Sequence, residues 1–357
     1  MEFLTEYGLF LAKTITFLLA LILVISIVVS TSMKTQQPEK GHLTITKLND
    51  KFDDLAHTVK YVVLAPELIK AEEKAEKKGA KAEKKKRKAE LKQNKTAGKD
   101  VEKIAHKKRV FVTDFYGDIK ASATEELREV ITAILSVATP EDEVLLRLES
   151  QGGMVHSYGL AASQLARITA KEIPLTVCVD KVAASGGYMM ACVANKIISA
   201  PFAIIGSIGV VAQLPNFNRL LRKHDVDFEM FTAGKYKRTV TMFGENTDKG
   251  REKFMEDLED THVLFKEFIT ANRDKVDIEK VATGEIWFGT RALEQNLVDV
   301  IETSDQYLLG LKEEADLFQV DFVHKKTLPE KIGLNVAASV DGIITKWVQR
   351  MNNKMFT

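Results

Sequence analysis

From Arg109 onward, strand-like and helix-like stretches alternate, with short loops between them. The strand-like stretches are 109–119, 143–150 and 173–179, and the helix-like stretches are 123–138 and 154–169. Such alternation is typical of parallel strands joined by crossover helices. The 357 residues are enough for one large α/β domain, or two small ones, with an ample core. The sequence therefore predicts an α/β fold.

A run of uncharged, mostly apolar residues precedes this part of the chain. Residues 14–29 read TITFLLALILVISIVV, and residues 30–33 also carry no charge. As a helix, about 17 to 20 such residues cross a hydrocarbon core of about 30 Å. A cleaved secretory signal is the alternative, but its apolar region is shorter and its start is basic, whereas Glu2 and Glu6 are acidic. The sequence predicts an uncleaved anchor in residues 1–35, which contacts lipid through residues 14–30.

The second unusual segment, which we call the basic arm, is residues 70–109. It holds 17 Lys and Arg against 7 Asp and Glu, a local charge of +10, so the rest of the chain sums to −9. One interpretation is a solvated, partly helical or disordered spacer within a linker over 36–108. Adhesion to anionic lipid is another. Nucleic acid is disfavoured as a partner, because the arm has no aromatic residue to stack on bases.

Composition and cysteine content exclude several classes of protein. The chain is 45% hydrophobic and 28% charged, which excludes collagen and a wholly disordered chain. Cys178 and Cys192 lie in apolar stretches without metal-ligand companions, which favours two buried thiols. We expect neither a metal nor a cofactor.

Two glycine-containing loops lie between a strand and a helix. Residues 150–153 read SQGG, where backbone N–H groups can approach an anion at a helix N-terminus, although a tight turn is the simpler interpretation. Residues 183–187 read AASGG, and Ser185 opens an apolar helix. Ser185 is either a nucleophile, with the N–H of Gly186 facing a substrate carbonyl, or a plain helix N-cap.

A serine nucleophile needs a base, because its hydroxyl is a weak nucleophile at its ordinary pKa. By sequence, His156 and His224 are not placed for a Ser-His-Asp arrangement, which leaves a lysine whose burial favours its uncharged form. Residues 229–238 read EMFTAGKYKR, which predicts a strand running into a glycine turn with three cations. Spacing alone does not choose between Lys235 and Lys237.

Four motifs resemble those of one known family. They are AASGGY at 183–188, GSIGV at 206–210, GKYK at 234–237 and WFGTRALEQNLVD at 287–299. In this order and at these separations they resemble the signal peptide peptidase A family, which is serine peptidase family S49. The resemblance implies a Clp protease/crotonase-like fold of repeated strand–helix units and a Ser–Lys dyad. The anchor followed by a basic arm is similar to the SohB-type inner-membrane peptidases within this family.

The resemblance assigns the reacting residues. Ser185 matches the nucleophile, and Lys237 matches the general base, because the family's lysine ends a G-x-x-K turn. Ser207 is similar to the serine that orients the lysine amine. The resemblance also implies apolar surroundings for the dyad.

The oxyanion hole is carried over in the same way. Gly152, Gly153 and the amide of Gly186 resemble the groups that hold the oxyanion. The family's first loop is usually S-P-G-G, and Gln151 replaces the proline here, which removes a fixed φ but leaves the amides.

Together these features predict a membrane-anchored serine endopeptidase that cleaves peptides, such as signal peptides or hydrophobic peptides derived from membrane proteins. We expect Met189, Ile208, Val210 and Phe231 to surround the dyad and accommodate such peptides. Two alternatives are a crotonase-like acyl-CoA enzyme, on the same fold, and a proteolytically silent membrane scaffold whose working part is the basic arm.

The remaining expectations concern organisation. The peptidase domain is predicted over 109–305 and a C-terminal extension over 306–357, with an amphipathic helix within 328–352. Amphipathic helices are also predicted over 216–225 and 250–272. The resemblance implies a homo-oligomeric ring and a periplasmic catalytic domain at the inner membrane, whereas the lysines that follow the anchor favour the cytoplasmic side.

Overall fold

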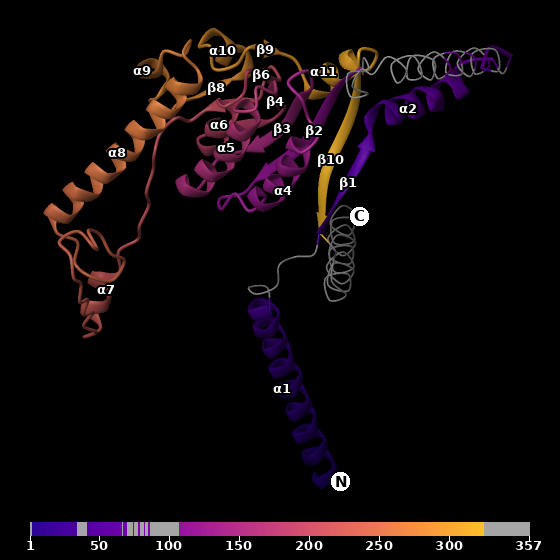
Figure 1. Ribbon diagram of the computed structural model, residues 1–357. Helices are drawn as coiled ribbons and strands as arrows, with labels where there is room; N and C mark the ends of the chain where they lie inside the picture. Colours follow the sequence, from indigo (N-terminus) through magenta and orange to yellow (C-terminus); the bar gives the residue numbers. More distant parts are fainter. Residues whose placement is uncertain are drawn as a thin grey trace, which may run out of the picture. The chain divides into compact units, whose positions relative to one another are not determined.

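The computed structural model describes residues 2–33, 41–65, 67–69, 74, 78, 82, 85 and 107–324 (Figure 1). The chain forms two units: Leu43–Phe322, which we call the body, and the chain ends, Met1–His42 with Val323–Thr357. Most of the basic arm and the predicted amphipathic helix within 328–352 lie outside the described residues.

In the described residues, ten strands form one sheet. The order is β1-β10-β2-β3-β4-β6-β9, while β5 joins β3 to β7, and β7 pairs with β8. The pairs from β10 across to β9, and both pairs of β5, are parallel, whereas β8 runs antiparallel to β7. The strands are β1 Gly41–Lys47, β2 Lys108–Gly117, β3 Glu143–Ser150, β4 Leu175–Val179, β5 Val182–Ala184, β6 Lys196–Ser199, β7 Ile204–Gly206, β8 Ile286–Phe288, β9 Val300–Ile301 and β10 Ala315–His324.

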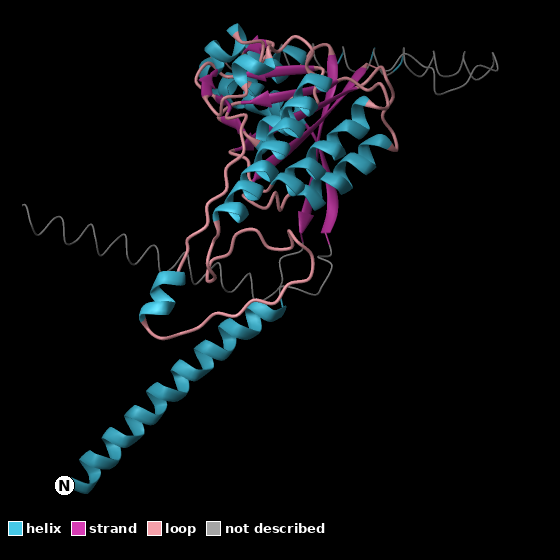
Figure 2. Cartoon of the chain, turned by 90° about the vertical axis from the view of Figure 1, so that its left-hand side faces the viewer, coloured by secondary structure: helices cyan, strands magenta, loops and turns pink. Residues whose placement is uncertain are grey.

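Helices connect these strands and cover both faces of the sheet (Figures 1 and 2). Those of the body are α2 Leu48–Val63, α4 Thr124–Leu135, α5 Val155–Thr169, α6 Gly186–Ala191, α7 Asn218–Lys223, α8 Asp248–Asn272, α9 Ile278–Val281, α10 Gly289–Glu294 and α11 Ser304–Leu311. Because successive side chains of a strand point to opposite faces, Phe111 and Phe115 join a core with α4, α5 and α6, while Val110 and Val112 join a second core with α11 and the start of α2.

The predicted α/β alternation is confirmed. The strands expected at 109–119, 143–150 and 173–179 are β2, β3 and β4, and the helices between them are α4 and α5. Residues Leu127, Val130, Ile131 and Ile134 are buried along one side of α4, as their helical spacing predicts. The helices expected at 216–225 and 250–272 are α7 and α8. The two cysteines are free and buried, as predicted.

Two strands of the sheet lie outside the range predicted for the peptidase domain. β10 pairs in parallel with β2, with Ala315 opposite Lys108, so the sheet continues beyond residue 305. β1 follows β10 at the edge of the sheet, although its sequence lies in the predicted linker.

The prediction of a strand before Gly234 is wrong. In the described chain, residues 225–233 form no strand and pair with no neighbour, and Phe231 is 89% exposed. The glycine turn itself is present, because Gly234 has φ +99° and its carbonyl accepts the N–H of Lys237 at 3.2 Å. We call residues 210–247 the projecting segment, since these long loops and α7 extend away from the sheet beyond the end of α8 (Figures 1 and 2).

The unit of the chain ends contains α1, Glu2–Met33, which includes residues 14–30, the part of the anchor predicted to contact lipid. The hydroxyls of Thr14 and Thr16 donate to carbonyls one turn earlier in the helix, those of Phe10 and Ala12, each at 2.8 Å. Among the described residues, none of the helices combines the length and apolar character needed to span a bilayer.

A buried ion pair holds the C-terminal end of α8 against the sheet. Arg273, whose side chain is 3% exposed, contacts both carboxylate oxygens of Asp299, at 2.9 and 3.2 Å. Burial alone would raise the pKa of the Asp299 carboxyl, but hydrogen bonds from Arg273, Lys275 and the amide of Ile197 outweigh it and hold that pKa below its usual value.

Replacing this carboxylate is expected to destabilise the body. Asp299→Asn leaves the Arg273 guanidinium without its anionic partner, so we expect the free energy of unfolding at pH 7 to fall by about 3 kcal/mol. In the wild type, the lowered pKa of the Asp299 carboxyl stabilises the folded state at pH values above about 4, the pKa of an aspartate in the unfolded chain. This stabilisation is lost as the pH falls through the lower pKa of the folded state. Urea unfolding at pH 7 and pH 3 should therefore show a smaller pH effect in the variant, and Asp54→Asn, at an exposed carboxylate, is the control.

Candidate active site

Ser185 lies between β5 and α6 in a backbone conformation that is rare for a residue with a side chain. Its φ is 51° and its ψ is −119°. Such conformations cost of order 1–3 kcal/mol and gather at functional sites. Although Ser185 is the N-cap residue of α6, its side chain makes no capping hydrogen bond. The hydroxyl is therefore not engaged in the role that a plain N-cap serine has.

The parallel pairing of β5 and β7 places Ser207 beside Ser185. Ala184 is paired with Gly206, and each serine is the first residue after its strand. The N–H of Ser185 donates to the carbonyl of Gly206 at 2.7 Å. Ser207 also has a positive φ, 50°. The structure thus brings together two of the predicted site residues at the ends of adjacent strands.

The first glycine loop packs directly against Ser185. Gly152 has φ +88°, and a Cβ built on it would lie 2.7 Å from the nitrogen of Gly186 and 2.8 Å from the Cβ of Ser185. Only glycine fits this close approach. The N–H of Gly152 donates to Ser150 Oγ at 3.0 Å, whereas the N–H groups of Gly153 and Gly186 have no acceptor among the described residues.

Tyr158 and Asp118, which the sequence analysis did not single out, hold this loop in place. The hydroxyl of Tyr158, which is fully buried, donates to the carbonyl of Asp118 at 2.7 Å and lies 2.5 Å from Ser150 Oγ. Burial raises the pKa of the Tyr158 phenol, so it stays protonated and can donate. The Tyr158 ring also lies against Gly186, where a Cβ would come within 2.4 Å of it. These contacts support a loop in which Gln151 stands where the resemblance implied a proline.

Removing the phenol oxygen is expected to loosen the loop. Tyr158→Phe removes the hydrogen bonds of the phenol with the Asp118 carbonyl and with Ser150 Oγ, so we expect the free energy of unfolding to fall by about 1–2 kcal/mol. For the predicted peptide cleavage, we expect kcat to fall by a larger factor than KM changes, because the ring and its packing remain. Urea unfolding and steady-state kinetics measure the two effects, and Tyr116→Phe, at an exposed tyrosine of β2, is the control.

A small cavity opens beside Ser185. Its lining is mostly apolar and comes from the first loop, α5, α6, α8 and the segment after β7. It includes Gly153, Val155, Gly186, Met189, Gly209, Val210, Thr261 and Phe265. Met189 and Val210 lie where we expected them, and Ile208 is buried in the adjoining core. Phe231, 89% exposed on the projecting segment, is absent from this lining.

Lys237 is also on the projecting segment, and its side chain is exposed. It follows the Gly234 turn, as predicted, but it does not line the cavity that contains Ser185. Neither His156, which is exposed on α5, nor His224 lines that cavity. In the described part of the chain, no group of His, Cys, Asp and Glu is placed to hold a metal ion.

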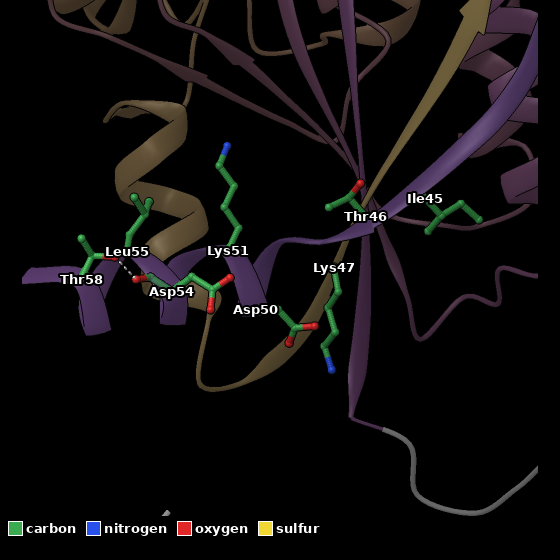
Figure 3. A pocket seen from close by; sticks show the side chains of 8 residues that line it. All are labelled: Ile45, Thr46, Lys47, Asp50, Lys51, Asp54, Leu55 and Thr58. Carbon is green, nitrogen blue, oxygen red and sulfur yellow. Dashed lines mark hydrogen bonds between the residues drawn. The ribbon is translucent and has the colours of Figure 1, made fainter. Parts of the chain in front are cut away.

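A larger hollow, of about 490 Å³, lies at the junction of β1 and α2 (Figure 3). Figure 3 shows side chains of both signs around it, including Lys47, Asp50, Lys51 and Asp54. Lys47 is paired with Asp316 at 2.8 Å. None of the predicted site residues lines this hollow, so its size does not make it the catalytic cleft.

Comparison with known families matches most of the chain. The family model described as "Peptidase family S49 N-terminal" matches residues 2–165, and the one described as "Peptidase family S49" matches residues 167–318. The second match includes Ser185, Ser207 and Lys237.

Several curated proteins are similar over almost their full length. A protein of Haemophilus influenzae named "Probable protease SohB" is 51% identical over 346 residues, 97% of this chain and 96% of that protein. A protein of the same name from Buchnera aphidicola, subspecies Acyrthosiphon pisum, is 49% identical over 97% of this chain and 98% of its own length. A "Putative signal peptide peptidase SppA" of Enterococcus faecium is 28% identical over 51% of this chain and 54% of that protein.

Proposed function

The chain belongs to peptidase family S49 and is a serine-type peptidase, and we propose that Ser185 is its nucleophile. One observation carries the assignment: Ser185 has a strained backbone at the N-terminus of a buried helix, yet its hydroxyl does not cap that helix. The strain orients the side chain for another role. The opening beside it, between Met189 and Phe265, suits a peptide substrate with apolar side chains.

We assign the oxyanion hole to the amides of Gly153 and Gly186, which have no acceptor among the described residues. Both glycines line the cavity with Ser185. Gly152 has a different part in this arrangement: its N–H is bonded to Ser150, and its lack of a side chain lets the loop approach Ser185. Two free donors are enough to stabilise the negative charge on a carbonyl oxygen.

The base in this proposal is Lys237 of a neighbouring copy of the chain. Within one chain the Lys237 side chain is exposed and lies outside the Ser185 cavity. The projecting segment that carries it also exposes large apolar side chains, including Val211, Leu220 and Phe231, at 81%, 53% and 89%. Exposed apolar surface of this kind marks an interface. Docking against a second copy would bury the amine and favour its uncharged, proton-accepting form.

The proposed reaction is acyl transfer. Uncharged Lys237 accepts the proton of Ser185 as Oγ bonds to the peptide carbonyl carbon, and the two amides hold the oxyanion. The C–N bond then breaks, and the lysine returns the proton to the leaving amine. Water, deprotonated by the same lysine, hydrolyses the ester and releases Ser185. We assign to Ser207, which directly follows the adjacent strand β7, the role of orienting the incoming amine.

We further propose that α1 anchors the chain in the inner membrane and that the body has a Clp protease/crotonase-like fold. The parallel strands joined by α4 and α5 support this assignment of the fold. The apolar run of residues 14–29 and the exposed apolar side chains of α1, such as Phe10 and Phe17, support the anchor. The threonine hydroxyls of α1 are bonded within the helix, so they present no unsatisfied donor to lipid.

A serine-directed acylating probe tests the nucleophile. We expect a fluorophosphonate to label the full-length wild-type protein at Ser185, because only an activated serine reacts with it. Ser163→Ala, at an exposed serine of α5, should be labelled as the wild type is. Failure of the wild type to react, or labelling of Ser185→Ala to the same extent, would contradict the assignment.

A further inference from the structure

One apolar stripe runs along the whole of α2. Leu48, Phe52, Leu55, Val59 and Val62 recur at alternating intervals of four and three residues, which places them on one side of the helix. The first two pack in the second core of the body, where Leu48 is 3% exposed. The last three are 57%, 63% and 86% exposed. We call these three the uncovered stripe.

The stripe is uncovered because the body holds only the start of α2. The side chain of Asn49 donates to the carbonyls of Lys312 and Ala315, each at 3.0 Å, and accepts the N–H of Leu317 at 2.8 Å. Lys312 also pairs with Asp53 at 2.6 Å. These bonds fix the direction of the helix, and its second half extends past the sheet (Figure 1). An apolar surface held in this way is available to a partner.

Charge identifies the kind of partner. The basic arm follows the uncovered stripe in the sequence with a net charge of +10, while the rest of the chain is acidic. An apolar helix face next to a polybasic segment provides two binding contributions that together hold a protein on an anionic lipid surface. A nucleic acid fits less well, because the stripe is aliphatic and the arm lacks aromatic residues.

We propose that the uncovered stripe docks α2 onto an anionic bilayer surface, and that the net charge of the basic arm favours anionic lipid over neutral lipid. The docking requires neither the Ser–Lys dyad nor its oligomer. The proposed anchor acts only as a tether in this docking. Fewer than twenty residues separate residue 30 from α2, and so short a connection raises the effective concentration of the helix at the membrane.

A fluorophore on α2 tests the docking in the full-length protein. Val59→Cys places an environment-sensitive label on the stripe. Tyr61→Cys is the control and places the label about 200° around the helix axis from position 59. The two side chains have similar exposed fractions, 63% for Val59 and 59% for Tyr61. The native thiols do not compete, because Cys178 and Cys192 are buried and burial raises the pKa of both. The vesicles are phosphatidylcholine alone, or with about one-third phosphatidylglycerol.

We expect the label at position 59 to brighten about threefold in the anionic vesicles and to be quenched there by spin-labelled lipid, while the label at 61 changes little. Replacing Lys84, Lys85, Lys86, Arg87 and Lys88 with glutamine should remove most of this response, because the arm loses half of its net charge. Flotation with the neutral vesicles tests the anchor separately from the docking.

Several results would overturn the docking. Equal shielding of position 59 in neutral vesicles or detergent would show that another segment or a second copy covers the stripe. Equal responses at 59 and 61, no response at either, or a full response in the glutamine variant would each contradict an electrostatically assisted lipid contact. A chain that fails to float with neutral vesicles, yet brightens with anionic ones, would contradict only the anchor.

Discussion

Cleavage of a peptide substrate by the full-length protein is expected to fall by about 10⁴-fold or more when Ser185 is replaced with alanine. The substitution removes the only oxygen of this side chain, and the amides of Gly153 and Gly186 cannot form an acyl-enzyme by themselves. The rate constant for hydrolysis, measured at matched protein concentration, gives the size of the loss.

The same variant is expected to remain folded. The Ser185 hydroxyl makes no capping bond, and alanine has the same Cβ at a φ of 51°, so the free energy of unfolding should change by only about 0.5 kcal/mol. Ser163→Ala should retain both activity and stability. If Ser185→Ala cleaves peptide at a rate near that of the wild type, the nucleophile lies elsewhere. If it unfolds, the loss of activity carries no information about the chemistry.

Mixed oligomers of Ser185→Ala and Lys237→Ala chains are expected to recover about one quarter of the wild-type activity, although each variant alone is inactive. We assume that every site takes its serine from one chain and its lysine from the next, and that equal amounts of the two variants assemble at random. An intact serine then meets an intact lysine at one site in four. Refolding the full-length chains together and measuring peptide hydrolysis tests this result.

A second mixture distinguishes the two possible locations of the dyad. Wild-type chains mixed with the Ser185→Ala/Lys237→Ala double variant should also give about one quarter of the activity when the dyad spans two chains. A dyad within one chain would give about one half in this mixture and nothing in the first. Lys235→Ala, at the neighbouring cation, should behave as the wild type, since Lys235 lies over the ring of Tyr236 at 4.8 Å.

Sequence reasoning was most successful where structure is local. The spacing of Leu127, Val130 and Ile131 predicted α4, and the β-type run 143–150 matches β3 at both ends. Helical and strand periodicity needs only the residues of the element itself and one apolar face to bury. The AASGGY motif likewise indicated that Ser185 follows a strand and opens an apolar helix, and the structure contains both elements.

It was least successful where an element depends on distant partners. β1 and β10 become strands because they join an existing sheet, and nothing within Gly41–Lys47 predicts that pairing. Residues 229–232 have strand-like composition, but within the described chain no neighbouring strand pairs with them. The contact of Tyr158 with Ser150 and Asp118 joins three positions over 40 residues, a link that no sequence pattern signals.

By itself the sequence determined the chemical groups available to this peptidase: a serine followed by glycines, a lysine after a glycine turn, an apolar run near the N-terminus and a basic arm. Only the tertiary structure decided how these groups are arranged, with Ser185 and Ser207 side by side and Lys237 outside their cavity. The physical reason is that periodicity records which face of an element is buried, whereas the distance between two side chains depends on which elements pack together.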